Sequence, residues 1–147
     1  MRLTKLKEEH LGMIAELEKL CFAHPISTNN LKMLLPDGIG EGYVILDDEE
    51  KLALAYGGII CVLDEGQILN IATHPSHRRQ GYGREIMKTI IENAKEKGIT
   101  FITLEVRESN LSAISLYESL GFFNVGRLRG YYDSPKEDAL ILRLDLI

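Results

Sequence analysis

Residues Gln67–Gly98 read QILNIATHPSHRRQGYGREIMKTIIENAKEKG, and this stretch decides the fold. It starts with the apolar run Ile68–Thr73, which predicts a buried strand. The tripeptide His74-Pro75-Ser76 ends that run, because proline cannot donate to a sheet ladder and pushes its neighbour out of helical geometry. A helix is predicted next, since apolar residues recur with the spacing of one helix face at Ile86, Met87, Ile90, Ile91 and Ala94. Gly98 is the expected C-terminal glycine of that helix.

Between the strand and the helix lies a basic turn with two glycines, residues 77–84, reading HRRQGYGR. The first N–H groups of a helix have no partner within it, and the helix dipole favours negative charge beside them. Three arginines, Arg78, Arg79 and Arg84, stand in this turn although the chain carries a net charge of -5. The pattern therefore predicts an anion site for phosphates. The alternative is an ordinary basic turn with two flexible glycines.

The spacing of the glycines selects among phosphate motifs. A P-loop needs GxxxxGK[ST], and no lysine follows these glycines. A dinucleotide fingerprint needs GxGxxG, but Ile86 occupies the place of its third glycine. The pattern Arg78-x-x-Gly81-x-Gly83 resembles the [QR]-x-x-G-x-[GA] pyrophosphate loop of the GNAT superfamily of N-acetyltransferases, which bind acetyl-CoA. That resemblance implies that the pyrophosphate is held by Arg78, Arg79, Gln80, Gly81, Tyr82, Gly83 and Arg84.

Length and composition narrow the class of protein. The chain has 147 residues, which fits one domain over 1–147, and 45% of them are hydrophobic, a globular value. It has no run of eighteen apolar residues and no cleavable N-terminal signal, so we expect a cytoplasmic protein with no membrane partner. Its negative charge argues against a direct nucleic-acid partner. Cys21, Cys61 and the four histidines show no metal-ligand spacing, so we expect no metal and two reduced, mostly buried thiols.

The remaining elements surround the central strand and helix. Strands are predicted at Arg2–Leu6, Gly42–Leu46, Leu52–Leu63, Ile99–Val106, Phe122–Arg127 and Ala139–Leu144. Helices are predicted at Glu8–Phe22, from Ser27 or Thr28 to about Leu35, and at Leu111–Leu120. We expect a bulge or a close backbone approach at Gly57-Gly58 and a loop at Tyr131–Pro135. Hairpins, then strand-helix-strand-helix, then a final hairpin predict a mixed α/β fold.

Two side chains have the chemistry of an acid and a base. Glu105 stands near the C-terminal end of a strand, where ligands gather in α/β sheets, and partial desolvation there would suit a general base. The alternative is a surface glutamate paired with Arg107 or Arg127. The Tyr117 hydroxyl can protonate a leaving thiolate, and the alternative is a core tyrosine with a satisfied hydroxyl.

Three further residues have two interpretations each. Asn110 can cap the helix that follows it, or it can hydrogen-bond a ligand amide. Tyr131 and Tyr132 can line a peptide groove, or they can belong to a loop anchored by one buried ring.

The run LEVRESNLSAISLYESLGF at 104–122, with NIATHPSHRRQGYG at 70–83, closely resembles the RimI branch of the GNAT superfamily. Those enzymes acetylate the N-terminal amine of a ribosomal protein. The resemblance implies a central, mostly antiparallel mixed sheet, splayed at its middle strands and flanked by helices, with acetyl-CoA in the split. It makes Glu105 the general base, through water, and Tyr117 the general acid. The backbone of Ile71-Ala72-Thr73 would pair with pantetheine and polarise the thioester carbonyl, and Asn110 would contact the cofactor.

The acceptor is where the sequence departs from the family pattern. RimI-like chains usually carry Pro-Trp-Ser before the second helix, and here the tripeptide is Pro25-Ile26-Ser27. The expected partner is the N-terminal segment of a protein, with ribosomal proteins among the candidates. Two other functions stay open: acetylation of a small amine such as a polyamine or aminoglycoside, and a non-catalytic acyl-CoA-binding module.

Overall fold

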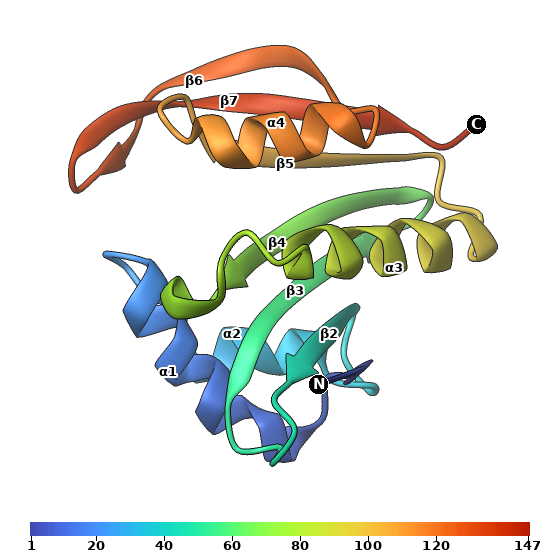
Figure 1. Cartoon of the computed structure of the whole chain (residues 1–147). Coiled ribbons are helices and arrows are strands. Elements are labelled where there is room, and N and C mark those ends of the chain that lie inside the picture. Colours follow the sequence, from blue (N-terminus) through green and yellow to red (C-terminus); the bar gives the residue numbers. More distant parts are fainter.

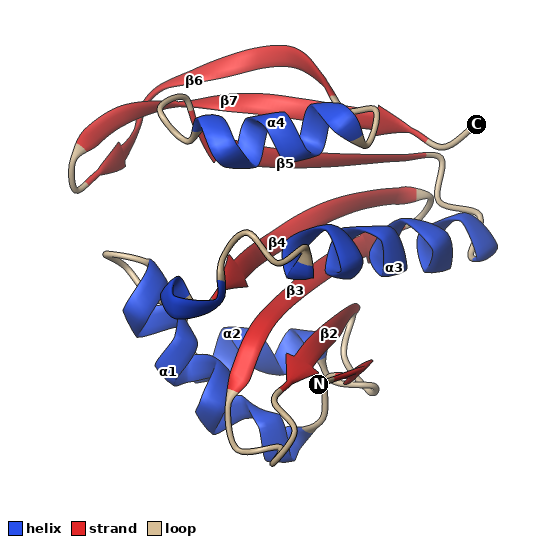
Figure 2. Cartoon of the chain, viewed as in Figure 1, coloured by secondary structure: helices blue, strands red, loops and turns tan.

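The computed structural model describes the whole chain, residues 1–147, around a seven-stranded sheet with the order β1-β2-β3-β4-β5-β7-β6 (Figure 1). The strands are β1 (Arg2–Lys5), β2 (Gly40–Leu46), β3 (Ala53–Val62), β4 (Glu65–Thr73), β5 (Phe101–Arg107), β6 (Phe123–Asp133) and β7 (Lys136–Asp145). The helices are α1 (Leu11–Cys21), α2 (Thr28–Leu31), α3 (Tyr82–Glu96) and α4 (Leu111–Ser119), with 3-10 turns at Glu8–His10, Lys32–Leu34 and Pro75–His77 (Figure 2). The mixed α/β architecture predicted from the sequence is confirmed.

All neighbouring strands are antiparallel except β4 and β5, which are parallel. A parallel pair needs a crossover connection, and the predicted helix supplies it as α3 between these two strands. The five apolar residues that define the helix face are all buried: Ile86, Met87, Ile90, Ile91 and Ala94. Gly98 has a φ of +80° just beyond α3, the left-handed conformation expected after a helix end.

The sheet buries apolar side chains on both faces. On β2, Tyr43 and Ile45 belong to one core cluster, and Val44 and Leu46 to the other, as the alternation of a strand requires. The first cluster includes the buried face of α3 and Tyr117 of α4, and the second includes residues of α1 and α2. Two helices therefore cover each face (Figure 2). None of the helices has the length and apolar character needed to cross a lipid bilayer.

The loop predicted at Tyr131–Pro135 needs correction. Tyr131, Tyr132 and Asp133 were predicted in a loop, but they form the end of β6, where Tyr132 pairs with Glu137 and Asp133 with Lys136 of β7. Only Ser134 and Pro135 remain in the turn. The bulge expected at Gly57-Gly58 is confirmed: the register shifts between Gly58 and Ile59, and the extra residue, Leu69, lies on the partner strand β4.

The two cysteines were expected to be mostly buried. Cys21 and Cys61 are free thiols and each is only half-buried.

Candidate active site

The middle of the sheet opens between β4 and β5, which diverge after a short parallel ladder (Figure 1). Three residue pairs join them: Glu65 with Phe101, Gly66 with Ile102 and Gln67 with Thr103. Beyond these, β5 continues beside β7 as far as Arg107, whereas β4 continues beside β3 as far as Thr73. The predicted split at the middle strands is therefore confirmed. Backbone groups on the far half of β4 have no strand partner on the β5 side.

The ladder with β3 decides which backbone groups of β4 face this split. The His74 N–H donates to the Leu54 carbonyl at 2.8 Å. Hydrogen-bonded and non-bonded pairs alternate along an antiparallel ladder, so the groups of Ala72, opposite Tyr56, also face β3. Those of Ile71 and Thr73 point the other way, into the opening. Of the three backbone positions proposed for a ligand, Ile71 thus has both groups directed into the opening, and Thr73 offers its N–H, because its carbonyl accepts from the Arg78 and Cys21 side chains.

The glycine turn leads into the N-terminus of α3. Gly81 is the N-cap with φ of +83°, and no atom lies within 4 Å of where a Cβ would stand. Glu85 is the first residue of the helix whose N–H bonds back to the chain, to the Gly81 carbonyl at 3.1 Å. The N–H groups of Tyr82, Gly83 and Arg84 therefore have no helical partner, which is the arrangement that binds anions.

The three arginines of the turn differ in their contacts. Arg79 and Arg84 are exposed and form no ion pair with a carboxylate, so their charge is available to a ligand. Arg78 instead turns back towards the sheet. Its Nε donates to the Thr73 carbonyl at 3.2 Å, and its guanidinium lies 3.7 Å from the Cys21 sulfur. Arg78 thus links the turn to the end of β4 and to α1.

Glu105 lies on β5 on the side of the strand that is not fully buried, with Phe101 and Thr103, while Ile102, Leu104 and Val106 are buried. This is the alternation predicted from the sequence. Its carboxylate accepts a hydrogen bond from Gln67 of β4 at 3.2 Å. The arginines that could have neutralised it are engaged elsewhere: Arg107 pairs with Glu137, and Arg127 pairs with Glu108 and Asp138. The alternative of a salt-bridged surface glutamate does not hold.

Tyr117 projects from α4 into the larger core cluster, where its ring packs against Phe122 with centroids 5.8 Å apart. Its hydroxyl forms no hydrogen bond within the protein, yet no fully buried side-chain oxygen or nitrogen lacks a partner. The hydroxyl oxygen of Tyr117 is therefore not fully buried and keeps some solvent-accessible surface. Burial, and then the neighbouring Tyr132, raises the pKa of Tyr117 to about 12. The phenol is protonated throughout the neutral range.

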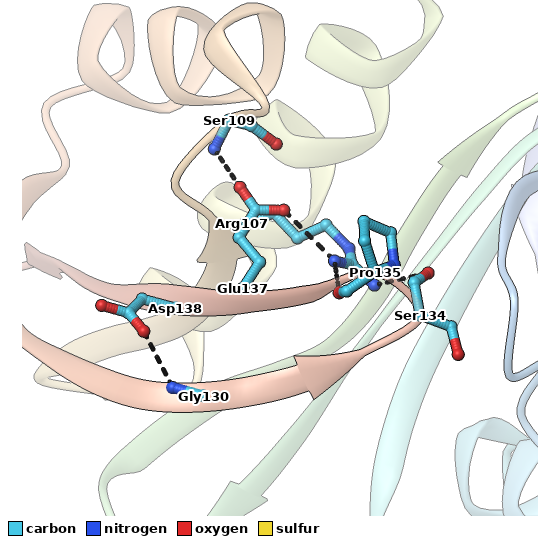
Figure 3. A network of polar contacts seen from close by, with 7 residues as sticks. All are labelled: Arg107, Ser109, Gly130, Ser134, Pro135, Glu137 and Asp138. Carbon is cyan, nitrogen blue, oxygen red and sulfur yellow. Dashed lines mark hydrogen bonds and ion pairs between the residues drawn. The ribbon is translucent and has the colours of Figure 1, made fainter.

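Arg107 at the end of β5 is hydrogen-bonded to the turn of the β6–β7 hairpin (Figure 3). The same hairpin carries Tyr131 and Tyr132 on β6. The Arg107 guanidinium donates to the carbonyls of Ser134 and Pro135, at 3.3 and 2.9 Å, and stacks 4.3 Å from the centre of the Tyr132 ring. Burial, and then the neighbouring Tyr131, raises the pKa of Tyr132 to about 12. Tyr131 packs edge-on against Tyr132 and is 54% exposed, so it can meet a ligand.

Carboxylates complete the same network and fix the loop before α4. Glu137 accepts from the Ser109 N–H at 2.7 Å and pairs with Arg107 at 3.2 Å (Figure 3). The contact with Ser109, and then Arg107, holds the pKa of Glu137 below its usual range. On the same strand, Asp138 accepts from the Gly130 N–H at 2.8 Å. Asn110 caps α4, since its Oδ1 accepts from the Ala113 N–H at 3.2 Å, and its side-chain N–H₂ group stays free.

The segment between α1 and α2 faces the hairpin. His24 and Asp133 lie 2.7 Å apart and join the two, and the hydrogen bond from His24 lowers the pKa of Asp133. The predicted cap of α2 is confirmed, because the Ser27 hydroxyl accepts from the Asn30 N–H at 3.1 Å. The departure at Pro25-Ile26-Ser27 therefore lies in a segment that borders the opening of the sheet.

Two contacts and one buried charge in this region were missed by sequence reasoning. Gln67 contacts Glu105, His24 contacts Asp133, and Glu18 of α1 has no exposed surface. The pairs Gln67–Glu105 and His24–Asp133 left no signal, because their members are far apart in sequence. Glu18 left one, because it follows Ile14 and Leu17 at the spacing of their buried helix face.

Comparison with known proteins identifies relatives of this chain. The [ribosomal protein bS18]-alanine N-acetyltransferase of Escherichia coli K12 is 44% identical over 87 residues, which cover 58% of this chain and 59% of that relative. The alignment thus spans less than two thirds of that protein's length. The enzyme of the same name from Haemophilus influenzae is 37% identical over 132 residues, covering 86% of each chain.

A solved structure and a protein-family model give the same assignment as these relatives. The crystal structure of the ribosomal-protein-S18-alanine N-acetyltransferase from Escherichia coli superimposes with a TM-score of 0.88, at 31% identity, over 99% of this chain and 93% of that one. The protein-family model described as "Acetyltransferase (GNAT) family" matches residues 11–122, which is well over half of the sequence. The split sheet, the glycine turn at α3 and these matches together establish that the chain belongs to the GNAT family of acetyltransferases.

Proposed function

We propose that this protein transfers the acetyl group of acetyl-CoA to a primary amine, the N-terminal α-amine of a protein, by direct attack on the thioester. The observation that carries the proposal is the opening between β4 and β5. It leaves a backbone edge of β4 open between the carboxylate Glu105 on the diverging end of β5 and the N-terminus of α3, which follows the end of β4. The two-faced core supports residues 1–147 as one catalytic domain.

The residues present fit acetyl-CoA. The pyrophosphate would accept hydrogen bonds from the N–H groups of Tyr82, Gly83 and Arg84, with Arg79 and Arg84 adding charge. Gln80 and Gly81 would form the wall of the turn, and Arg78 would hold the turn against Thr73. The pantetheine arm would lie along the open edge of β4 at Ile71 and the Thr73 N–H, with Ala72 between them, and Asn110 would offer its free amide N–H₂.

Glu105 would accept the proton of the attacking amine through a water molecule. An acetyl transfer to an amine needs the neutral nucleophile, and a protein α-amine has a pKa near 7.7–8.0 against about 10.4 for lysine. A weak base is enough for an α-amine, which agrees with a single carboxylate as the only base. The hydrogen bond from Gln67 would hold that carboxylate in place.

Tyr117 would assist the departing sulfur. Its hydroxyl stays protonated because burial raises its pKa to about 12. A thiol has a pKa near 8.5, so full proton transfer from this phenol is uphill. Most of its effect as a general acid would come from the hydrogen bond that strengthens while charge grows on the sulfur.

The acceptor would enter between the α1–α2 segment and the β6–β7 hairpin, against Tyr131 and Tyr132. Aromatic rings with hydroxyl groups suit a peptide backbone. The relatives named for acetylating a ribosomal protein support a protein N-terminus as the acceptor, and ribosomal proteins are the first to test.

An acetylation assay over a panel of acceptors tests this proposal. The panel contains peptides with a free N-terminus, the same peptides with a blocked N-terminus and an internal lysine, and small amines such as a polyamine and an aminoglycoside. Release of CoA thiol measures turnover, and mass spectrometry locates the acetyl group. Acetylation of the α-amine supports the proposal. Preference for a small amine would instead indicate a small-amine acetyltransferase. Binding of acetyl-CoA without turnover of any amine would indicate a non-catalytic acyl-CoA-binding module.

A further inference from the structure

A charged side chain is completely buried beside the candidate active site. Glu18 of α1 has 0% exposed surface and forms no ion pair with a cation. Burying a carboxylate is costly unless hydrogen bonds compensate it. Three donors do so here: the Ile26 N–H at 2.8 Å, the Asn70 side-chain amide at 2.7 Å, and the Tyr56 hydroxyl.

These three donors come from three separate parts of the fold. Ile26 lies in the segment between α1 and α2, Tyr56 on β3, and Asn70 on β4 directly after the bulge at Leu69. Burial, and then the adjacent Glu18 carboxylate, raises the pKa of Tyr56, so its hydroxyl stays protonated and donates. The Glu18 carboxylate therefore joins the α1–α2 segment, at Ile26, to β4, at Asn70. The α1–α2 segment borders the proposed acceptor entrance, and the open edge of β4 faces the proposed acetyl-CoA site.

A second contact supports the same geometry. Cys21, one helical turn beyond Glu18, places its sulfur 3.4 Å from the Thr73 carbonyl on β4. The end of α1 is thus attached to β4 on both sides of Ile71 and Ala72. The bond from Glu18 to the Ile26 N–H is what extends this attachment from the helix to the segment beyond it.

We propose that Glu18 is a positioning residue that sets the distance between the acceptor segment around Ile26 and the acetyl-bearing edge of β4. This inference rests on the proposed function and adds a residue that touches neither substrate. A misplacement of about 1 Å at a reacting centre can cost up to ~10²-fold in rate, so the geometry of this segment matters to turnover.

Glu18→Gln tests the inference, because it keeps the volume of the side chain but replaces one acceptor oxygen by a donor N–H₂ group. We expect the KM for the acceptor to rise and kcat/KM for it to fall by about 10-fold, while the KM for acetyl-CoA stays within about twofold. Amide hydrogen exchange in residues 22–27 should become faster. Tyr56→Phe removes one donor and keeps the bond to Ile26, so it should give a smaller change in the same direction.

The control is Ile14→Val, one turn earlier on the same buried face of α1, which lowers the Tm by removing one buried methyl group without touching the network. A purely structural Glu18 would behave like this control: a lower Tm and unchanged kinetic constants for the folded enzyme. Unchanged acceptor KM in Glu18→Gln despite faster exchange, or an equal rise in both KM values, would overturn the inference. If Glu18→Gln does not fold, Tyr56→Phe with an unchanged acceptor KM would overturn it instead. Absence of wild-type turnover with every amine would contradict the proposed function itself.

Discussion

The Nε2 atom of Gln67 lies 3.2 Å and 3.5 Å from the two carboxylate oxygens of Glu105. Gln67 belongs to the last residue pair that joins β4 to β5, and Glu105 stands two residues beyond its partner Thr103. The contact therefore spans the point where the sheet begins to open. Gln67 of β4 thus holds the Glu105 carboxylate just beyond the point where β5 diverges from β4.

This relationship predicts that Gln67→Leu lowers turnover although Gln67 takes no part in the chemistry. Loss of one hydrogen bond to a partly exposed carboxylate should cost about 1 kcal/mol in the transition state, or roughly 5-fold in kcat. Glu105→Gln alone and together with Gln67→Leu forms a double-mutant cycle. If Gln67 acts through Glu105, the second substitution adds little to the first. Fully additive losses in kcat would show that Gln67 acts independently.

The glycine turn predicts a cofactor defect that can be separated from strain. Gly81 and Gly98 flank α3 with nearly equal φ values of +83° and +80°, and at both a Cβ would meet no atom within 4 Å. Gly81→Val and Gly98→Val should therefore lose similar stability, of order 1–2 kcal/mol. Only Gly81→Val places a branched side chain beside the free amides. We expect its affinity for acetyl-CoA, measured by calorimetry, to fall at least about 10-fold. Equal affinities of the two variants for acetyl-CoA would show that the pyrophosphate does not bind at the glycine turn.

Tyr117→Phe should lower kcat by about 10²-fold, the lower end of the range for general acid assistance, with little change in the KM for acetyl-CoA. Because burial raises the pKa of Tyr117 to about 12, this hydroxyl should stay protonated at pH 9 and cause no alkaline loss of rate there. Tyr43→Phe is the matched control, since Tyr43 is also a buried tyrosine, and its hydroxyl bonds to Glu41 on β2. Equal kcat values for both variants and wild type would leave Tyr117 as a packing residue.

Local patterns in the sequence were sufficient for the elements that carry the site. The periodicity from Ile86 to Ala94 predicted α3, and the alternation from Phe101 to Val106 predicted which side of β5 Glu105 would occupy. Both patterns depend on residues close in sequence and on one buried face. Asn110 could likewise be predicted as a helix cap, because a cap bonds to the residue three positions later.

Contacts between distant segments were beyond those patterns. Tyr131 to Asp133 carry turn-forming neighbours, and only pairing with Lys136 and Glu137 makes them part of β6. Arg78 contacts the Thr73 carbonyl at the end of β4 and the Cys21 sulfur of α1, partners that the sequence could not place beside it. The donors around Glu18 come from residues 26, 56 and 70, so no periodicity could show that its charge is compensated.

The last prediction concerns Glu105 and the acceptor together. Glu105→Gln keeps the size of the side chain but loses the basic oxygen, so turnover at neutral pH should fall by at least about 10²-fold. The loss should shrink as the pH rises, because more of the amine is already neutral. At pH 8 about half of a peptide α-amine is neutral, against less than ~1% of a lysine amine, so wild-type enzyme should prefer a free N-terminus. The measurement is kcat/KM for both kinds of peptide from about pH 6.5 to 9.5, with these amine pKa values setting the window. Glu108→Gln is the control, because Glu108 lies just beyond β5 and pairs with Arg127 outside the proposed site. Identical pH profiles for wild type and Glu105→Gln would remove Glu105 from the mechanism, whereas a blocked lysine peptide outperforming every free N-terminus would overturn the acceptor.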